Sequence, residues 1–208
     1  MSAVLRQLDA ALSGLGLGVP DGFQERVLAY IDLIAKWNRV YNLTAIRETD
    51  KALTHHVLDS LAVLPHIPGD RIADVGSGAG LPGIPLALAR PSWQVTLIES
   101  SHKKSSFLRQ VIADLELSNA TVLGARVEAV QPGGGFDVVI SRAFADLPEF
   151  ARLAGHLLAP GGVLVAMKGL YPDEELALLP VSWRVDNVIA LQVPGLAASR
   201  HLVVARAA

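Results

Sequence analysis

The sequence has 208 residues, of which 51% are hydrophobic, 18% are charged and 5% are aromatic, and it contains no cysteine. The high apolar fraction excludes a disordered chain, and the absence of cysteine excludes disulfide frameworks, thiolate metal sites and thiolate nucleophiles. Eighteen Lys and Arg against twenty Asp and Glu give a net charge of −2, which excludes a protein held to nucleic acid by bulk charge alone. At about 150 residues per domain, the length favours one integrated domain.

The hydropathy of the chain and its first residues favour a cytoplasmic location. Residues 1–8 show no apolar segment followed by a cleavage pattern. No uncharged apolar run reaches the roughly 18 residues that a membrane-spanning helix needs. His55 and His56 lack the spacing of metal ligands. We therefore expect a cytoplasmic monomer with neither a membrane segment nor a metal site.

The first third of the chain has the pattern of helices. Apolar residues recur at helical spacing over residues 4–12, 21–37 and 50–64, and glycines and prolines separate these stretches. Asp21 is placed to cap the second helix. Residues 1–69 are therefore predicted to form a helical extension that packs on the rest of the protein.

From residue 70 onward, short β-rich runs alternate with helical stretches. Five strands are predicted, at Arg71–Val75, Gln94–Ile98, Ala120–Leu123, Asp137–Ile140 and Val163–Met167. Helices are predicted between them at Leu86–Ala89, Lys103–Leu115 and Leu147–Leu158. Arg184–Gln192 and His201–Ala205 are predicted to close the sheet as an antiparallel pair. This order predicts an α/β fold over residues 70–208, with a mostly parallel, Rossmann-like sheet and helices on both faces.

A glycine-rich segment, Asp74-Val75-Gly76-Ser77-Gly78-Ala79-Gly80-Leu81-Pro82-Gly83, follows the first predicted strand and opens a helix. Glycines there let the backbone approach a ligand and present N–H donors at the helix start. Residues 78–83 also fit the dinucleotide pattern Gly-x-Gly-x-x-Gly, which leaves a nicotinamide-dependent oxidoreductase as an alternative. Glu99, after the second strand, could accept the hydroxyls of a ribose in either case.

Several segments taken together resemble a known family. The glycine-rich segment, Glu99, Phe136-Asp137 and Pro160-Gly161-Gly162 resemble class I methyltransferases that use S-adenosylmethionine. The glycine-rich segment continues to Pro85, and four further segments occur with it in one order along the chain. They are Trp37–Thr44, His56–Ser60, Ile140–Ala143 and Ala166–Gly169. They resemble the RsmG (glucose-inhibited division protein B) family of small-subunit ribosomal RNA guanine-N7 methyltransferases, over nearly the whole chain.

The resemblance implies an activity and its partners. It implies a class I methyltransferase fold with a seven-stranded sheet, and transfer of a methyl group from S-adenosylmethionine, with S-adenosylhomocysteine as product. The acceptor it implies is N7 of a guanine in 16S ribosomal RNA, in the 530 loop near the decoding site. The partner would be this RNA or the small ribosomal subunit. A non-catalytic RNA-binding scaffold and another RNA methyltransferase of the same fold remain alternatives.

The resemblance also implies roles for individual residues. It places Gly76 and Leu81, in the loop with Gly78 and Gly80, against the methionine and adenosine parts of the cofactor. Glu99 would hold the ribose. Val127 and Glu128 are the candidates for the adenine pocket. Arg142 is the candidate for the cofactor-site arginine, and Lys168 is the candidate at the end of the fifth strand. Arg142 and Lys168 are the candidate catalytic residues.

Each of these roles has a structural alternative. Glu99 could be a helix cap, and Glu128 could be a solvated helix residue. Arg142 could pair with Asp146. The family often has Ala where Val127 stands, which leaves a backbone contact to the adenine plausible.

The residue types available restrict the acceptor atom. Methylation of a pyrimidine at C5 needs a cysteine nucleophile, which the chain lacks. Methylation of an exocyclic amine commonly uses an Asn/Asp-Pro-Pro-aromatic segment after the fourth strand, where this chain has Ser141-Arg142-Ala143-Phe144. Guanine N7 carries an in-plane lone pair and needs no general base, so positioning would supply most of the acceleration.

RNA would have to meet a local basic patch because the chain as a whole is slightly acidic. Lys36, Arg39, Arg47 and Lys51 lie in one segment, and Lys103 and Lys104 begin the helix after Glu99. Lys36, Arg39, Lys103 and Lys104 are the predicted phosphate contacts, which salt would weaken steeply. The alternative for each is an ordinary solvated helix face.

Overall fold

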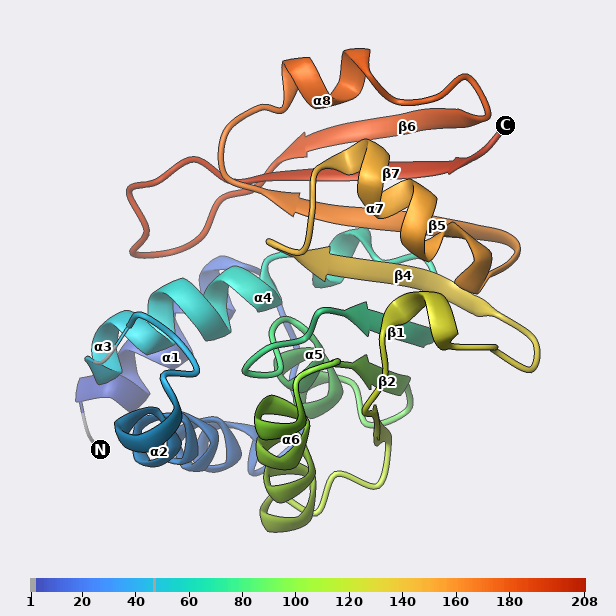
Figure 1. Cartoon of the computed structure of the whole chain (residues 1–208). Coiled ribbons are helices and arrows are strands. Elements are labelled where there is room, and N and C mark those ends of the chain that lie inside the picture. Colours follow the sequence, from blue (N-terminus) through green and yellow to red (C-terminus); the bar gives the residue numbers. More distant parts are fainter. Residues whose placement is uncertain (1–2, 47) are drawn as a thin grey trace.

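A seven-stranded sheet forms the centre of the computed structural model, which describes residues 3–46 and 48–208 (Figure 1). The strand order is β3-β2-β1-β4-β5-β7-β6, and the first five strands in this order are parallel. β7 is antiparallel to both of its neighbours. The predicted α/β class is confirmed, with strands β1 Arg71–Val75, β2 Gln94–Ile98, β3 Ala120–Leu123, β4 Phe136–Arg142, β5 Leu158–Lys168, β6 Trp183–Ala190 and β7 His201–Ala207.

Helices cover both faces of this sheet because successive strand side chains point to opposite sides. Ile72 of β1 joins the apolar cluster on one face and Ala73 joins the cluster on the other. The first cluster lies under α1 Ala3–Gly14, α2 Phe23–Tyr41, α3 Thr49–Ala52, α4 Asp59–Leu61, α5 Gly83–Ala89 and α6 His102–Asp114. The second lies under α7 Leu147–Ala154 and takes in residues that follow α8 Asp173–Ala177. None of the described helices combines the length and apolarity needed to cross a membrane.

The N-terminal segment is helical, but its details differ from the prediction. α2 begins at Phe23 after Gly22, whose φ is 73°, and no side chain caps it, so the prediction that Asp21 caps this helix was wrong. The predicted helix over residues 50–64 contains a π-helical turn at Leu53–Leu58 between α3 and α4. A π turn and an α turn place apolar residues at similar spacing, so the sequence pattern could not distinguish them.

The Pro160-Gly161-Gly162 segment, which precedes the fifth strand predicted from the sequence, lies inside β5. The register between β4 and β5 pairs Phe136 with Leu158 and then Val138 with Val163, so the intervening β5 residues bulge out of the ladder. A side chain at position 162 would place its Cβ 2.7 Å from the Phe136 carbonyl oxygen. The glycine therefore keeps the bulge closed, and β5 begins five residues earlier than predicted, which shortens α7 from the predicted end at Leu158 to Ala154.

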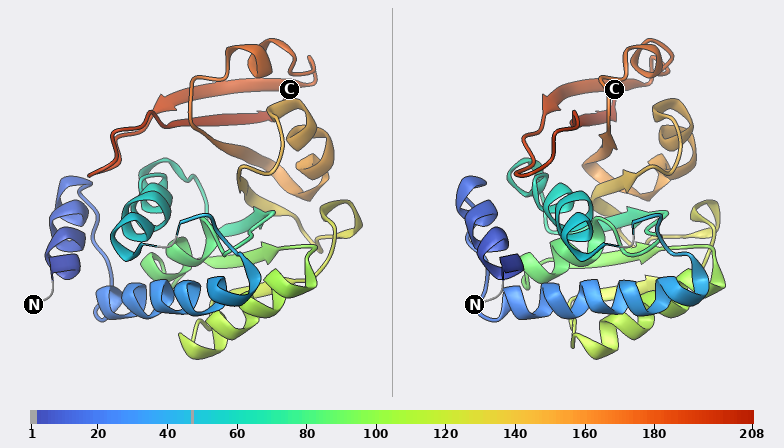
Figure 2. Two further views of the ribbon diagram at one scale, coloured as in Figure 1. Left: turned by 60° about the vertical axis from the view of Figure 1, so that its left-hand side comes forward. Right: turned by 90° about the vertical axis from the view of Figure 1, so that its left-hand side faces the viewer.

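The loop between β6 and β7, residues 191–200, reaches back to the N-terminal helices (Figure 2). A Cβ at Gly195 of this loop would lie 3.6 Å from the Thr54 side chain and 3.8 Å from Gln7. The contact brings residues far apart in sequence together beside the carboxyl ends of β4 and β5. Parallel sheets of this kind bind their ligands at that edge.

Candidate active site

The glycine loop, residues 74–83, leaves β1 in a conformation that its own backbone fixes. Gly76, Gly78 and Gly80 have φ values of 68°, 59° and 91°, where side chains are strained. The N–H groups of Gly76 and Ser77 both donate to the Ile98 carbonyl oxygen, at 2.9 and 3.3 Å. The buried Tyr30 hydroxyl donates to the Ala79 carbonyl at 2.6 Å, which ties the loop to α2. The loop is thus held from β2 and from the N-terminal segment.

Asp74 holds the far end of the glycine loop from a fully buried position. Its Oδ2 accepts a hydrogen bond from the Gly83 N–H at 2.9 Å, which fixes the start of α5. Its Oδ1 has no partner among the described residues. Burial raises the pKa of Asp74 from 3.8 to about 7, although the Gly83 N–H and the Arg142 charge act in the opposite direction. The carboxyl group therefore carries an electrostatic penalty at neutral pH.

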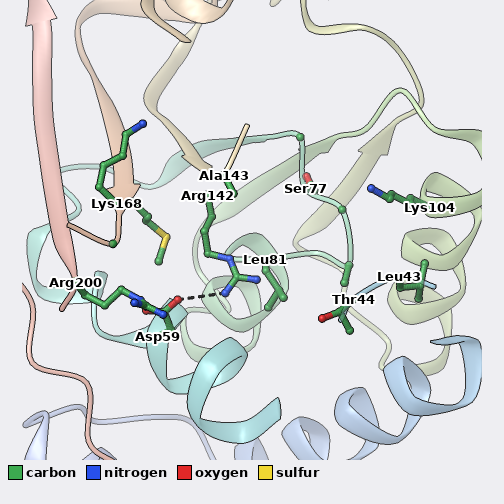
Figure 3. Close-up of a pocket in the computed structure, with 15 residues that line it drawn as sticks. Leu43, Thr44, Asp59, Ser77, Leu81, Lys104, Arg142, Ala143, Lys168 and Arg200 are labelled. Atoms are coloured by element: carbon green, nitrogen blue, oxygen red, sulfur yellow. Dashed lines mark hydrogen bonds and ion pairs between the residues drawn. The ribbon is translucent and has the colours of Figure 1, made fainter. Parts of the chain in front are cut away.

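A cavity of about 610 Å³, the first cavity, opens between the glycine loop and the ends of β4 and β5 (Figure 3). Gly76, Gly78 and Leu81 line one side, and Leu43 and Thr44 close it from the N-terminal segment. Its cationic lining residues are Lys104, Arg142, Lys168 and Arg200. Asp59 is the one carboxylate among the described residues that line it. The net charge of this lining favours an anionic ligand.

Asp59 holds two of these cations in place. Its Oδ2 lies 3.2 Å from Arg142 Nη1 and its Oδ1 lies 2.8 Å from Arg200 Nε (Figure 3). The Asp59 side chain is 3% exposed and the two guanidinium side chains are 22% and 21% exposed. Such a pair is buried enough that removing one partner leaves an uncompensated charge. We call Arg142, Lys168 and Arg200 the basic wall.

Arg142 and Lys168 lie at the ends of β4 and β5, and Arg142 does not have the partner that was considered as its structural alternative. Asp146 does not pair with Arg142 but caps α7, where its Oδ1 accepts from the Glu149 N–H at 2.8 Å. Arg142 instead donates to the His55 carbonyl at 2.9 Å in addition to Asp59. Lys168 pairs with Glu175 at 2.7 Å and donates to the Ala145 carbonyl at 3.1 Å, so one of its three ammonium hydrogens has no partner among the described residues.

His56 packs behind the basic wall on the π-helical turn. Its Nε2 lies 2.8 Å from the Thr44 hydroxyl, and its Nδ1 lies 3.5 Å from Arg142 Nη2. Burial and the Arg142 charge lower the pKa of His56 to about 4, so the ring is neutral at pH 7. Asn38 in turn holds the Thr44 backbone through both its amide groups, at 2.8 and 3.0 Å. The Trp37–Thr44 and His56–Ser60 segments therefore meet at one place.

A second cavity of about 410 Å³ adjoins the first across Gly76, which lines both. Val127 and Glu128 line it together with Phe144, so the predicted adenine-pocket residues lie beside the glycine loop. Phe144 packs closely on Gly76, because a Cβ at position 76 would lie 2.8 Å from Phe144 Cδ2. Ala143, the residue before Phe144, has a φ of 61°, an uncommon conformation that often marks a functional site.

Two predicted cofactor residues occupy less direct positions. Glu99 is 6% exposed and lines neither cavity; its two carboxylate oxygens accept from the N–H groups of Gly78 and Ser101, at 2.9 and 2.8 Å. Each oxygen keeps a second lone pair. Gly80 faces the core, because a Cβ there would lie 2.5 Å from Ile84 Cγ1. Glu99 thus stabilises the glycine loop by accepting the Gly78 N–H, and Gly80 allows α5 to pack against this loop.

The predicted RNA contacts gather around one end of α2 and the start of α6. Lys104 lines the first cavity, and Lys103 Nζ lies 5.9 Å from the centre of the Tyr41 ring. Lys36 and Arg39 are exposed on α2. Lys51, by contrast, pairs with Glu48 at 2.9 Å, and Arg47 lies outside the described residues.

Sequence reasoning missed Asp59 and Arg200. Asp59 stands in the His56–Ser60 segment, whose resemblance was recognised without a role for the carboxylate. Arg200 has no local pattern around it, and its contact with Asp59 spans 141 residues. Among the described residues, no group of three or more His, Asp or Glu side chains is arranged to hold a metal ion.

The family model for rRNA small subunit methyltransferase G matches residues 23–203. The chain belongs to that family. It is 58% identical over 209 residues to the ribosomal RNA small subunit methyltransferase G of Nitrosospira multiformis, covering 97% of each chain. It is 55% identical over 197 residues to the protein of the same name from Laribacter hongkongensis, covering 95% of each. The protein is therefore a methyltransferase, and the nicotinamide-dependent and non-catalytic alternatives are set aside.

Solved structures of low sequence identity share the fold of this methyltransferase. The glycopeptide N-methyltransferase MtfA, in complex with S-adenosyl-L-homocysteine, matches with a TM-score of 0.62 at 13% identity, over 73% of this chain and 90% of that chain. A SAM-dependent methyltransferase from Aquifex aeolicus matches with a TM-score of 0.59 at 18% identity, over 74% and 92%. The class I methyltransferase fold is thereby confirmed, with S-adenosylmethionine as the methyl donor.

The residues present fit this donor. Two adjoining cavities meet at Gly76, which gives an elongated molecule room on both sides of the glycine loop. Gly78 leaves open the space that a Cβ would fill, since the nearest atom to such a Cβ lies 3.7 Å away, and the φ values of Gly76 and Gly78 admit few other residues. An elongated nucleoside with a charged amino-acid end matches one cavity lined by cations and a second beside Val127.

Proposed function

We propose that the protein transfers a methyl group from S-adenosylmethionine to N7 of a guanine in 16S ribosomal RNA, in the 530 loop near the decoding site, acting as a monomer on the RNA or the small subunit. The relatives that share more than half of its residues are named as ribosomal RNA small subunit methyltransferases. The observation that carries the proposal is the basic wall, which faces the glycine loop across one cavity.

The charge of the first cavity supports an RNA substrate despite the acidic total of the chain. Four cations line it, and its one described carboxylate, Asp59, is already shared by two arginines. A polyanion entering this cavity would replace water around those cations and release its own counterions. Lys103 and Lys104, with Lys36 and Arg39 beyond them, would continue the contact along the phosphate backbone.

No uncommitted carboxylate or imidazole lies among the described residues that line the first cavity, which supports N7 as the acceptor. The bound donor supplies a sulfonium methyl; the guanine N7 lone pair forms the new N–C bond while the S–C bond breaks, and the sulfur keeps the bonding electrons. No proton leaves N7, so no general base is required. Asp59 is engaged by two guanidinium groups, and the His56 ring is buried behind Arg142. The wall would therefore act by positioning the substrate.

We assign roles within the site on this basis. Gly76, Gly78 and Leu81 would contact the donor, with Gly80 shaping the loop from the core side. Val127 and Glu128 would line the adenine end. Glu99 would hold the ribose through its remaining lone pairs while it supports the loop. Arg142 and Lys168 would hold the acceptor, and Arg142, which lines the same cavity as Gly76, would contact the donor as well.

Transfer of labelled methyl tests the proposal. The protein is incubated with labelled S-adenosylmethionine and either naked 16S RNA or small-subunit particles, and the product is cleaved chemically at N7-methylguanine. Label at one guanine of the 530 loop is the expected result. Label at another atom or another RNA, or none with any ribosomal substrate, would contradict it.

The ribose role of Glu99 is tested separately by calorimetry. Glu99→Ala is expected to weaken donor binding by about 1–3 kcal/mol, because charge-assisted hydrogen bonds are lost. Glu128→Ala is the comparison at the adenine end. Unchanged donor affinity in a folded Glu99→Ala protein would remove Glu99 from the site.

A further inference from the structure

The last two turns of α2 expose aromatic and apolar side chains, whereas its earlier turns bury theirs. Ile31 and Ile34 are each 2% exposed, but Val40 is 70% and Tyr41 44% exposed. A groove of about 390 Å³ runs along this end of the helix, between Trp37, Val40 and Tyr41 of α2 and the side chain of Gln110 of α6. The exposed apolar end of α2 has no covering element among the described residues.

The aromatic side chains at this end form a ledge anchored in the core. The rings of Trp37 and Tyr41 are 5.2 Å apart and tilted by 37°. Trp37 also makes an edge contact with Phe107 of α6, at 5.5 Å, and Phe107 is fully buried. Tyr41 is thus the outer ring of a chain of three, held by neighbours that cannot move easily. A ring fixed in this way can stack a planar ligand at little entropic cost.

The groove is lined by one lysine and one aspartate, Lys36 and Asp114, and Lys103 adds a second cation beside the Tyr41 ring. Lys103 Nζ lies 5.9 Å from the Tyr41 ring centre, and Lys36 lines the groove from α2. Asp114, at the α6 side, is engaged by the Gln110 amide at 2.6 Å. The exposed Lys103 side chain can exchange its contact with the ring for a phosphate oxygen. Lysine ammonium groups beside an exposed aromatic ring are the combination that holds single-stranded nucleic acid.

The ledge also lies next to the first cavity. Leu43 and Thr44, two and three residues after Tyr41, line that cavity, and so does Lys104, the neighbour of Lys103. Both segments that carry the ledge therefore continue directly into the wall of the cavity. A strand that enters the cavity with one nucleotide would bring an adjacent nucleotide to Tyr41.

We propose that Tyr41 and Trp37 form a stacking ledge for an unpaired base next to the methylated guanine, with Lys103 and Lys36 holding the adjoining phosphates. This inference rests on the proposed function, because it takes RNA as the substrate. It adds a base contact to the phosphate contacts, and it requires that the nucleotides beside the acceptor are single-stranded. A protein partner on this face would make no contact with a nucleobase, and RNA binding would then be unaffected by loss of the ring.

Substitution of Tyr41 tests the ledge. Tyr41→Leu keeps an apolar side chain and removes the ring, Tyr41→Phe keeps the ring, and Leu178→Ala, an exposed apolar residue after α8, is the remote control. RNA binding is measured by fluorescence anisotropy with a labelled 16S fragment that spans the 530 loop. Tyr41→Leu is expected to weaken binding about tenfold or more and to raise KM for RNA with little change in kcat. Tyr41→Phe and Leu178→Ala should bind as the wild type does.

A second variant keeps the test valid if Tyr41→Leu does not fold. Lys103→Gln is expected to reduce the slope of log affinity against log salt by about one counterion. Binding of RNA should also quench the fluorescence of Trp37, which Trp93→Phe/Trp183→Phe leaves as the sole tryptophan reporter. No quenching on RNA binding would contradict the ledge.

The outcomes separate the ledge from the proposed function. Normal RNA affinity and normal methyl transfer by folded Tyr41→Leu would overturn the ledge and leave the function intact. If the wild type binds the fragment but methylates no ribosomal RNA, the function fails, and the Tyr41 comparison still decides on the ledge. Donor affinity, measured by calorimetry, should be equal in all these variants, and its loss in Tyr41→Leu would show a structural role instead.

Discussion

The glycine loop and the basic wall face each other across one cavity, but they are built in different ways. The loop is one contiguous segment whose shape depends on glycine conformations and hydrogen bonds to the backbone. The wall consists of three side chains from the ends of β4 and β5 and the loop before β7, and carboxylates elsewhere in the chain hold them. The loop is therefore shaped by glycine conformations and by hydrogen bonds to its backbone, and the wall is held by ion pairs between side chains.

This contrast predicts different sensitivities. The loop should tolerate loss of distant charges but not a change of backbone conformation. The wall should tolerate small changes of backbone but not the loss of a buried carboxylate. Substitutions in the two regions can therefore be compared directly.

The largest effect is expected at Asp59, whose loss leaves two guanidinium groups without their partner. Asp59→Asn is expected to lower the free energy of unfolding by about 3–5 kcal/mol and to reduce methyl transfer strongly. Urea denaturation and transfer assays measure the two effects. Asp186→Asn is the matched control, because Asp186 also bridges two arginines, Arg184 and Arg206, but on the surface. Equal stability of Asp59→Asn and Asp186→Asn would show that burial of the pair does not matter.

The next largest effect concerns the pH dependence of the free energy of unfolding, to which Asp74 of the glycine loop contributes. Because the pKa of folded Asp74 is raised to about 7 from 3.8, the folded state binds more protons than the unfolded state between these values. Its contribution to the unfolding free energy is therefore present at low pH and is lost, by a few kcal/mol, as pH rises towards 7. Asp74→Asn should remove this dependence. Urea denaturation at about pH 5 and about pH 8 compares the two proteins, and parallel pH profiles would contradict the prediction.

His56, which packs behind the basic wall, should make the free energy of unfolding respond to pH with the opposite sign. The pKa of folded His56 is lowered to about 4 from 6.5, so the unfolded state binds more protons between these values. This contribution is present above pH 6.5 and is lost as pH falls towards 4. The effect should be smaller than that of Asp74, because the shift of the His56 pKa from 6.5 to about 4 is smaller than the shift of the Asp74 pKa from 3.8 to about 7. His56→Gln should remove the decrease in the free energy of unfolding at acid pH and keep a hydrogen bond to Thr44. Urea denaturation between about pH 4 and pH 7 measures this decrease, and an equal decrease in the wild type and in His56→Gln would contradict the prediction.

The smallest expected effect on stability compares two glycines of the glycine loop, and it separates backbone strain from a steric contact with Phe144. Gly76→Ala is expected to destabilise by about 1–2 kcal/mol from its positive φ alone, and more because the new Cβ meets Phe144 at 2.8 Å. Gly78→Ala has a similar φ, but the nearest atom lies 3.7 Å away. The Tm of Gly76→Ala, measured by thermal unfolding, should therefore be lower than the Tm of Gly78→Ala. The reverse order would mean that Phe144 moves aside freely.

The same contrast explains which parts of the molecule the sequence could predict. The strands up to β4 follow from runs of apolar residues, and the loop follows from glycines at a strand–helix junction. The family resemblance placed Arg142 at the end of the fourth strand, where β4 does end. Its partner Asp59 lies 83 residues away, and no local pattern connects them. The bulge in β5 and the π-helical turn escaped prediction because each changes hydrogen bonding while leaving the apolar spacing nearly intact.

The position of β7 in the sheet has a consequence for the order of folding. β7 follows β6 in the chain but lies between β5 and β6, so β6 has no hydrogen-bonded neighbour until β7 has been synthesised and inserted. Arg200 immediately precedes β7, and its contact with Asp59 forms only at this late step. A nascent chain that already carries the glycine loop would still lack one of the four cations that line the first cavity. Insertion of one strand thus completes the sheet and the first cavity together.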